Sequence, residues 1–382
     1  MINPSTKANL AAHGHDQRVD LVRGIAIWFL LLDHIPHNIV NLLTLRNFGF
    51  SGAADLFVFV SGYAAAILFG KMTLERGFVI TTSQIIKRVG KLYAAHLVMF
   101  VIYLNTIGWV AARYGTTDII EQYHVIGILN DPVRVLMHGL LLLAKPLNLD
   151  VLQLLITLLA FFPFALVALL RWPNLTLVGS IALYLAARLF DIGPPAYPRG
   201  AADLNPLCWQ LLFVLGAWFA LNGRDLVRAL RGLTTLRIFA LSYLLFALVV
   251  TVASRDAVIG RLVPDFVLNL FAPNDRENLE PDRVLHFLLL ALVFVRLVPS
   301  DWFGLRWKLL QPVIKCGEEW LATFCAGVFL SFAGHLVLIT GPNSLAMQVL
   351  VSAGGLAAMT AVAYYVSWSK RQDHKSALGA HA

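Results

Sequence analysis

Long apolar runs constrain this chain more than any other feature of its sequence. Of the 382 residues, 58% are hydrophobic and 14% are charged. Many apolar residues gather in runs near the length of about 20 residues that a helix needs to cross a bilayer, which is not typical of soluble domains. We therefore predict an all-α integral membrane protein with about ten transmembrane helices. The predicted spans are 20–43, 53–70, 85–112, 148–170, 174–190, 206–222, 235–254, 282–299, 318–340 and 345–368.

The positions of the charges predict the orientation of these helices. When the N-terminus is placed in the cytoplasm, most of the 30 Lys and Arg residues fall inside, and most of the 22 Asp and Glu residues fall outside. The positive-inside rule therefore predicts that both termini are cytoplasmic. We expect one polytopic membrane domain at 19–369, an N-terminal tail at 1–18 and a C-terminal tail at 370–382. Disorder is expected at about 1–17 and 371–382.

Other features of the sequence argue against several classes of protein. Cys208, Cys316 and Cys325 are neither paired nor spaced like metal ligands, so we expect no disulfide framework and no zinc site. The net charge of +8 is scattered among the predicted spans, and topology explains it better than a nucleic-acid partner does. The first apolar run is too long for a cleaved signal peptide, and we expect it to be retained. We find no phosphate-binding loop, dinucleotide fingerprint, metal triad or Gly-x-Ser-x-Gly elbow.

The first predicted span, 20–43, carries charges that an inert anchor would avoid. Arg23 and His34 are eleven residues apart, about three helical turns. They therefore share one face of the helix and lie about 16 Å apart along its axis. A charge at the middle of a bilayer costs on the order of 2.5–3.5 kcal/mol. This face is therefore expected to meet protein or a water-filled cavity rather than lipid.

His34 is a candidate general base, because an imidazole titrates near neutrality. Asp33 could tune it, and His37 flanks the same face. Pro36 should kink the helix beside His34, because proline removes a backbone hydrogen bond. The alternative is a kinked helix whose histidine only bonds a neighbour.

The second predicted span, 53–70, has a narrow face of small residues. Asp55 lies near its outer end, and Ser61 and Gly62 are followed by three alanines. Small residues let another helix approach closely, so packing is the simpler explanation of this face. Asp55 and Ser61 remain candidates to line a substrate path, because a carboxylate entering a membrane usually has a partner.

A cationic cluster begins the third predicted span. Lys87, Arg88 and Lys91 lie at its inner end, and Tyr93 and His96 lie one to two turns deeper. Such a cluster is often an ordinary anchor whose side chains reach lipid phosphates. The functional alternative is a grip on the phosphates of a cytoplasmic donor that carries a nucleotide, with His96 lining the path beyond it.

Weaker signals remain outside these spans. Asp282 and His286, like Arg134 and His138, are separated by four residues, which is typical of a local pair or cap. The apolar stretch 132–145 is too short to span and is expected to form an interfacial or re-entrant helix.

Three of these motifs resemble those of membrane acyltransferases of the type 3 family. Arg23 followed by ten residues and His34 matches the family's Arg-x10-His motif. FVFVSGY at 57–63 is similar to its Phe-rich Ser-Gly-aromatic element. The basic cluster with Tyr93 resembles the start of its third span.

The closer resemblance is to the OpgC branch of these acyltransferases. It is carried by RNFGFSGAADLFVFVSGYAAA at 46–66 and by RVDLVRGIAIWFLLLDHIPHN at the front of the chain. CGEEWLATF at 316–324 resembles a later Gly-x-x-Ser-Leu element only loosely, because Trp320 stands where Ser is usual.

The resemblance implies a bundle like that of the type 3 acyltransferases in a bacterial inner membrane. It implies O-succinylation of periplasmic glucans. The co-substrate would be a cytoplasmic acyl-CoA, with succinyl-CoA as the expected donor, and no further cofactor is expected. CoA phosphates would meet Lys87, Arg88 and Lys91, next to Tyr93. His34 would act as base or as transient acyl carrier, with Arg23 orienting the donor. A succinyl group would also need a cation for its distal carboxylate, either Arg23 or an arginine of an outer loop.

Three alternatives remain open from the residues alone. A transporter or exporter of saccharide would use the same buried charges for a substrate path, although paired broken helices in two symmetric halves are not evident. A scaffold subunit of a glucan-synthesising complex would bind no CoA ester. An acyltransferase could also act on a different envelope polysaccharide or on a lipid-linked sugar.

Overall fold

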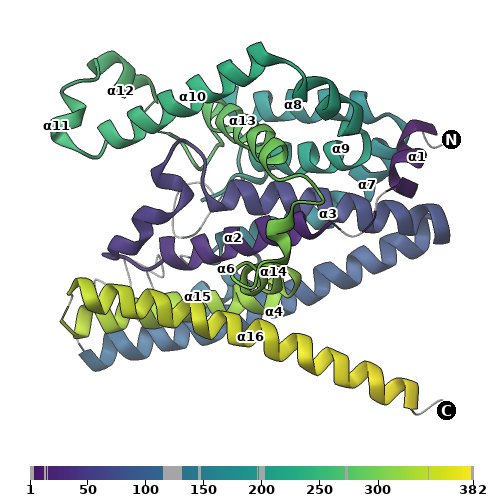
Figure 1. Ribbon diagram of the computed structural model, residues 1–382. Helices are drawn as coiled ribbons and strands as arrows, with labels where there is room; N and C mark the ends of the chain where they lie inside the picture. Colours follow the sequence, from purple (N-terminus) through teal and green to yellow (C-terminus); the bar gives the residue numbers. More distant parts are fainter. Residues whose placement is uncertain are drawn as a thin grey trace. The chain divides into compact units, whose positions relative to one another are not determined.

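The computed structural model describes residues 4–12, 14, 16–114, 131–144, 148–195, 197, 203–271, 274–342 and 344–379, and within these ranges it is built from helices without β-strands. Figure 1 shows the helices in chain order. They are α1 (Pro4–Ala12), α2 (Gln17–Asp33), η1 (Ile39–Leu43), η2 (Leu45–Asn47), α3 (Ala53–Arg76), α4 (Phe78–Tyr114), α6 (Pro132–Leu140), α7 (Asp150–Arg171), α8 (Pro173–Leu189), α9 (Pro206–Arg231), α10 (Thr234–Ala253), α11 (Ala257–Gly260), α12 (Asp265–Phe271), α13 (Pro281–Leu297), η3 (Phe303–Arg306), α14 (Gln311–Glu318), α15 (Trp320–Thr340) and α16 (Leu345–Gly379).

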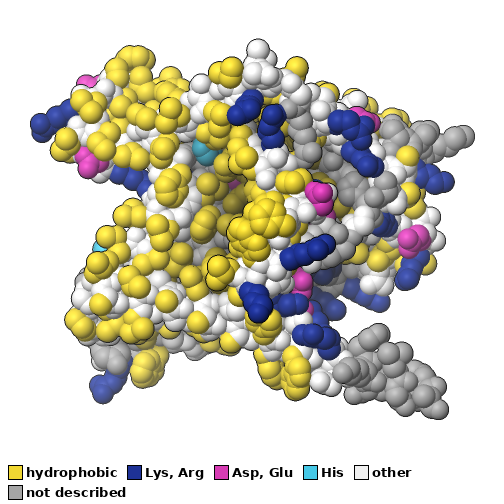
Figure 2. All heavy atoms as spheres, viewed as in Figure 1, with side chains coloured by type: hydrophobic (Ala, Val, Ile, Leu, Met, Phe, Trp, Pro, Cys, Tyr) yellow, Lys and Arg dark blue, Asp and Glu magenta, His cyan; other side chains and the backbone are white. Residues whose placement is uncertain are grey.

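Seven of the described helices are long and apolar enough to cross a membrane: α3, α4, α7, α9, α10, α15 and α16. The prediction of an all-α membrane protein is therefore confirmed at this level. The other three predicted spans correspond to α2, α8 and α13, which have 17 residues each. A count of ten spans and the orientation of the termini remain predictions. Figure 2 shows how widely hydrophobic side chains are exposed on one face, as a lipid-facing surface requires.

Local sequence explains where several helices begin. Asn205 precedes α9, and its side chain accepts a hydrogen bond from the backbone N–H of Leu207, with Pro206 in the first turn. Asp131 caps α6 in the same way, followed by Pro132. Between α3 and α4, Gly77 has a φ of +83°, a conformation that residues with a side chain rarely adopt.

The chain packs as two compact units. The first unit comprises Met1–His13, Val58–Gly232 and Asn274–Val284, and the second comprises Gly14–Phe57, Leu233–Pro273 and Leu285–Ala382. Helices α3 and α13 each contribute residues to both units.

In the first unit, α3 and α9 meet through glycine. A Cβ atom added to Gly62 would lie 2.0 Å from the carbonyl oxygen of Phe213, and one added to Gly216 would lie 2.0 Å from that of Phe59. Only glycine allows two backbones to come so close. The prediction that the small residues of the second span serve close packing is therefore confirmed at Gly62.

In the second unit, α2 and α14 cross in a similar way. A Cβ on Gly24 would lie 1.9 Å from the carbonyl oxygen of Val313, and one on Gly317 would lie 1.8 Å from that of Asp20. Close to this crossing, the indole nitrogen of Trp28 lies 3.4 Å from the Cys316 sulfur and donates to it. These contacts fix the helix that carries Arg23.

The structure corrects the first predicted span. Helix α2 ends at Asp33, so residues 20–43 do not form one helix with a kink at Pro36. His34 is the C-terminal cap, His37 adopts a φ of +57°, and the chain continues into η1 and η2. The physical reason is Pro36, which has no N–H to bond the carbonyl of Leu32 and disfavours helical backbone at the residue before it. The prediction for 318–340 also shifts, because the helix breaks at Glu319 and α15 starts at Trp320.

The expected disorder of the N-terminal tail is wrong for residues 4–12. They form α1, in which Leu10 is buried and the Thr6 hydroxyl donates to the side chain of Asn222 over 2.7 Å. At the other end, α16 continues to Gly379, beyond the predicted start of disorder at about 371. Much of the predicted outer connection 113–147 lies outside the described residues.

The helix α6 falls in the stretch predicted to be interfacial or re-entrant. It is nine residues long and packs on α4, where Gly139 lies against the ring of Phe100. The Tyr93 hydroxyl donates to the carbonyl oxygen of Leu140 over 2.7 Å. A helix this short does not span, and its contacts lie inside the segment predicted for the third span.

We expect Gly317→Ala to destabilise the second unit, because its methyl group would overlap a carbonyl oxygen of α2. Overpacking of this kind typically costs about 1–3 kcal/mol. The measurement is the melting temperature of the detergent-purified protein. Gly354→Ala on α16 is the matched control, since no atom lies within 4 Å of the added Cβ. Equal melting temperatures for the two variants would contradict the crossing described here.

Candidate active site

His34 lies at the C-terminal end of α2 in the second unit. Its backbone N–H donates to the carbonyl oxygen of Leu30 over 3.1 Å and thereby caps the last turn of the helix. The side chain is half-buried. Because the helix stops here, the imidazole stands at the point where regular backbone gives way to a loop.

The His34 side chain borders a small cavity between α2 and α15. The other lining residues are all apolar or glycine: Ile27, Leu30, Leu31, Phe324, Gly327 and Val328. Its volume is about 10 Å³, roughly the room that one water molecule needs. An acyl chain is much larger than this space.

Asp33, the neighbour of His34, is held by two groups of the following loop. Its Oδ1 accepts the hydroxyl of Thr44 over 2.5 Å and lies 3.1 Å from Nε of Arg46. Asn47 in turn donates to the Thr44 hydroxyl over 3.1 Å. Arg255, just after α10, donates to the backbone carbonyl of Arg46 over 3.1 Å. Asp33 is thus part of a polar cluster of Asp33, Thr44, Arg46, Asn47 and Arg255, called here the α2-end cluster.

Arg23 is buried, with 9% of its surface exposed. Its guanidinium lies 3.7 Å from the carboxylate of Asp20, one turn earlier on α2. The burial of Arg23 and the cavity at His34 agree with the expectation that this face of the helix meets protein. The sequence did not predict that Asp20 pairs with Arg23.

His37 is exposed, and its ring centroid lies 6.5 Å from that of the buried His335 on α15. Next to it, Asn38 donates to the hydroxyl of Ser352 on α16 over 2.8 Å. The loop after α2 is therefore tied to both α15 and α16.

Asp55 is fully buried, and its carboxylate accepts the backbone N–H of Gly52 over 2.7 Å. This is the backward half of a capping box at the start of α3. Ser51, just before the helix, bonds through its hydroxyl to Nδ1 of His286 over 2.7 Å, and both side chains are buried. Helix capping therefore accounts for Asp55, and His286 has found a partner that sequence spacing did not predict.

The first unit holds the other predicted site residues. Lys87 and Lys91 are exposed and Arg88 is half-buried on the first half of α4. His96 is fully buried and stacks on Phe100, with 5.8 Å between ring centroids.

Two further predicted residues of this unit already have structural surroundings. The Tyr93 hydroxyl is engaged with α6, as described above, and Ser61 is half-buried on α3 beside the glycine contact with α9. The structure thus groups Arg23, Asp33, His34, His37 and Asp55 in the second unit, and the cationic cluster, Tyr93, His96 and Ser61 in the first.

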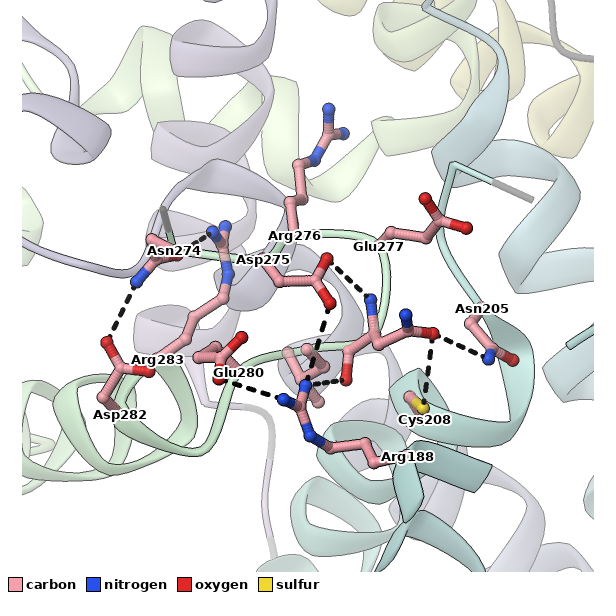
Figure 3. A network of polar contacts seen from close by, with 12 residues as sticks. Arg188, Asn205, Cys208, Asn274, Asp275, Arg276, Glu277, Glu280, Asp282 and Arg283 are labelled. Carbon is pink, nitrogen blue, oxygen red and sulfur yellow. Dashed lines mark hydrogen bonds and ion pairs between the residues drawn. The ribbon is translucent and has the colours of Figure 1, made fainter. Parts of the chain in front are cut away.

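A polar network in the first unit was missed by the sequence analysis (Figure 3). Arg188 on α8 donates to the carboxylate of Glu280 and to the backbone carbonyl of Asn278, both over 2.9 Å. Asn205 bonds the side chain of Asn278 over 2.9 Å, and Arg276 pairs with Asp150 over 2.6 Å.

These bonds tie the segment before α13 to the starts of α7 and α9 and to the end of α8. The signal available in the sequence was the density of charge, because six of the ten residues at 274–283 are charged. The partners named above, however, lie 73 to 126 positions away in the chain, and nothing in the local pattern identifies them.

Comparison with known proteins decides the family. The model of the OpgC protein family matches residues 15–371, nearly the whole chain. The chain belongs to the OpgC family. No curated protein and no solved structure matches it. The resemblance seen in the motifs around His34 and Ser61 is therefore confirmed at the level of the family.

Membership of the OpgC family implies an acyltransferase in a membrane, with an acyl donor and a glycan acceptor. In this OpgC-family protein, the histidine of the resembling motif borders a cavity and stands beside an ion-paired carboxylate. Such an arrangement can take a proton from a hydroxyl in a partly dry site.

We expect Thr44→Val to lower the free energy of unfolding by about 1–3 kcal/mol, because it removes a hydroxyl bonded to a carboxylate while keeping the side chain's shape. Chemical unfolding in mixed detergent micelles measures the change. The matched control is Thr340→Val, whose hydroxyl only bonds the carbonyl of Leu336 within the same helix. If both variants lower the free energy of unfolding by the same amount, the bond to Asp33 stabilises the protein no more than an ordinary hydrogen bond within a helix.

Proposed function

We propose that this OpgC-family protein transfers a succinyl group from cytoplasmic succinyl-CoA to hydroxyl groups of periplasmic glucans in the bacterial inner membrane. The observation that carries the proposal is His34 itself. Within a chain that belongs to the family, this histidine borders a cavity and directly follows a carboxylate that is locked in a hydrogen-bonded cluster.

The reaction breaks the thioester C–S bond and forms an ester C–O bond. His34 takes the proton of the sugar hydroxyl as its oxygen attacks the thioester carbonyl, and the departing thiolate of CoA finally receives a proton. In the second version of the mechanism, the imidazole nitrogen attacks the thioester carbonyl and releases the CoA thiolate. The sugar hydroxyl then attacks the acyl-imidazole and releases the imidazole, and the hydroxyl proton passes to the thiolate. The first version requires the imidazole nitrogen to reach the sugar hydroxyl, and the second requires it to reach the thioester carbonyl.

The donor's nucleotide end would bind at the cationic cluster of α4. Lys87 and Lys91 are exposed and can meet phosphate oxygens, and Arg88 adds a planar guanidinium beside them. Tyr93, whose hydroxyl already donates to α6, would keep α4 and α6 together at this site and offer its oxygen as an acceptor.

The remaining predicted residues would act around the reacting groups. Arg23 would orient the donor from within α2, where it is buried beside Asp20. His37, exposed at the loop after α2, would meet the glucan. Asp55 and Ser61 on α3 and His96 on α4 would shape the path of the acyl chain.

We expect His34→Ala to abolish succinyl substitution of the glucans, with a fall in rate of at least about 10²–10⁴, the usual range for loss of a general base. Mass spectrometry of periplasmic glucans, from cells that carry the variant in place of the natural gene, measures this.

His138→Ala is the matched control, because His138 stacks on Tyr197 in the first unit and has no role in the proposed reaction. Normally succinylated glucan from a folded, membrane-inserted His34→Ala protein would refute the proposal.

We further expect Lys87→Ala and Lys91→Ala to raise the KM for succinyl-CoA several-fold, with little change in kcat, because each removes a contact to a phosphate outside the reacting centre. The effect should shrink with high salt, since both side chains are exposed. Lys71→Ala, at the end of α3, serves as the control. A fall in kcat without a change in KM would contradict phosphate binding here.

A further inference from the structure

The α2-end cluster holds more positive than negative charge. Arg46 pairs with Asp33 through Nε, and its side chain is still 45% exposed. Arg255 bonds the backbone of Arg46 rather than a carboxylate. The nearby Asp256 caps α11, where its carboxylate accepts the backbone N–H groups of Val258 and Ile259. One carboxylate thus faces two guanidinium groups.

Both arginines remain charged, since a guanidinium is not deprotonated in proteins. Burial lowers the pKa of Arg255 below its usual value, Arg46 lowers it further, and Asp33 opposes the shift. The two cations therefore lie within range of each other's field. An anion placed between them would relieve this repulsion and accept hydrogen bonds from guanidinium nitrogens other than Arg46 Nε and Arg255 Nη2, which are already bonded.

The position of the cluster next to His34 limits what this anion can be. Asp33 and His34 are adjacent, with Cα atoms about 3.8 Å apart, and Arg46 lies within one hydrogen bond of Asp33. In a succinyl thioester, the distal carboxylate carbon lies about 4 Å from the carbonyl carbon, at ordinary C–C bond lengths. An acyl group that reacts at His34 can therefore extend its free end only over residues near the end of α2, which is where Arg46 pairs with Asp33.

Arg23 does not fit the same role. It lies on the same continuous helix ten residues before Asp33, about 15 Å along the axis, and it is buried beside Asp20. A four-carbon acyl group at His34 cannot bridge that distance.

We propose that Arg46 and Arg255 form a carboxylate subsite that binds the distal carboxylate of a dicarboxylic acyl group and so selects succinyl over neutral donors. This inference rests on the proposed function and names the residues that would give it donor specificity. A neutral donor would leave the cluster with two guanidinium groups and the single carboxylate of Asp33, and a polar site rejects an analogue strongly when its charge is left uncompensated.

The test compares succinyl-CoA with butyryl-CoA, which has the same four-carbon chain but ends in a methyl group. Transfer to neutral glucan is measured with the purified full-length protein in proteoliposomes. We expect Arg255→Gln to lower kcat/KM for succinyl-CoA by about 10- to 100-fold, the loss expected for one charged hydrogen bond, while butyryl transfer changes little. Arg46→Gln also breaks the ion pair with Asp33, so it should slow both donors, and succinyl-CoA more than butyryl-CoA. Arg255→Lys should recover part of the succinyl rate.

Arg261→Gln, an exposed arginine at the end of α11, is the matched control and should change neither rate. An equal loss with both donors, or no loss with either, overturns the assignment. A natural protein that transfers neither group would refute the proposed function, and the subsite with it. If butyryl transfer by the variants persists and the succinyl preference is unchanged, the proposed function stands and the subsite alone fails.

The same arginines could instead meet an anionic group that the glucan already carries. In that case Arg255→Gln would slow both donors equally when the acceptor glucan is anionic and neither when it is neutral. This outcome would place the carboxylate subsite on the acceptor and overturn its assignment to the donor.

Discussion

The end of helix α2 at Asp33 is the constraint on which the candidate active site depends. Pro36 prevents the helix from continuing, so the backbone turns and brings Thr44 and Arg46 back to the carboxylate of Asp33. An acidic residue is unfavourable at the negative end of a helix dipole, and Arg46 offsets this through its direct pair. A helix that continued to residue 43 would carry Thr44 more than 10 Å along the axis from Asp33, and the cluster could not form.

Glycine contacts hold each unit's helices close enough to position these groups. In a membrane, apolar side chains gain little by leaving lipid, so close backbone approach contributes more to helix association than it does in water. The first unit uses Gly62 and Gly216 between α3 and α9, and the second uses Gly24 and Gly317 between α2 and α14. The second crossing lies beside Asp20 and Arg23. A buried ion pair and a backbone contact are therefore set by the same few residues.

The sequence was sufficient to predict features that the bilayer imposes. It was insufficient for features that depend on tertiary contacts. Apolar runs predicted a helical membrane protein, and the cost of a charge in lipid predicted that Arg23 is covered by protein. Both predictions depend on how side chains interact with lipid and not on which distant residues they contact. The predicted end of the first span was wrong, because the helix was assumed to continue beyond Pro36. Arg46 and Arg255 were not singled out, since their relation to Asp33 depends on loop conformation. The network around Arg188 joins residues up to 126 positions apart, and a local sequence pattern cannot predict contacts between residues so far apart in the chain.

The burial of Arg23 also determines how its role can be read from variants. Removing one partner of a buried ion pair leaves the other charge without compensation, which typically costs about 3–5 kcal/mol and can mimic a loss of catalysis. Arg23→Ala would remove the charge that lies 3.7 Å from the Asp20 carboxylate beside the crossing of α2 and α14. A fall in activity therefore indicates donor binding only if it persists when Asp20 is also made neutral. A double-mutant cycle separates the two effects. A change in KM for the CoA ester that is independent of the free energy of unfolding would indicate donor binding by Arg23, and a change that parallels the loss of stability would indicate only the ion pair.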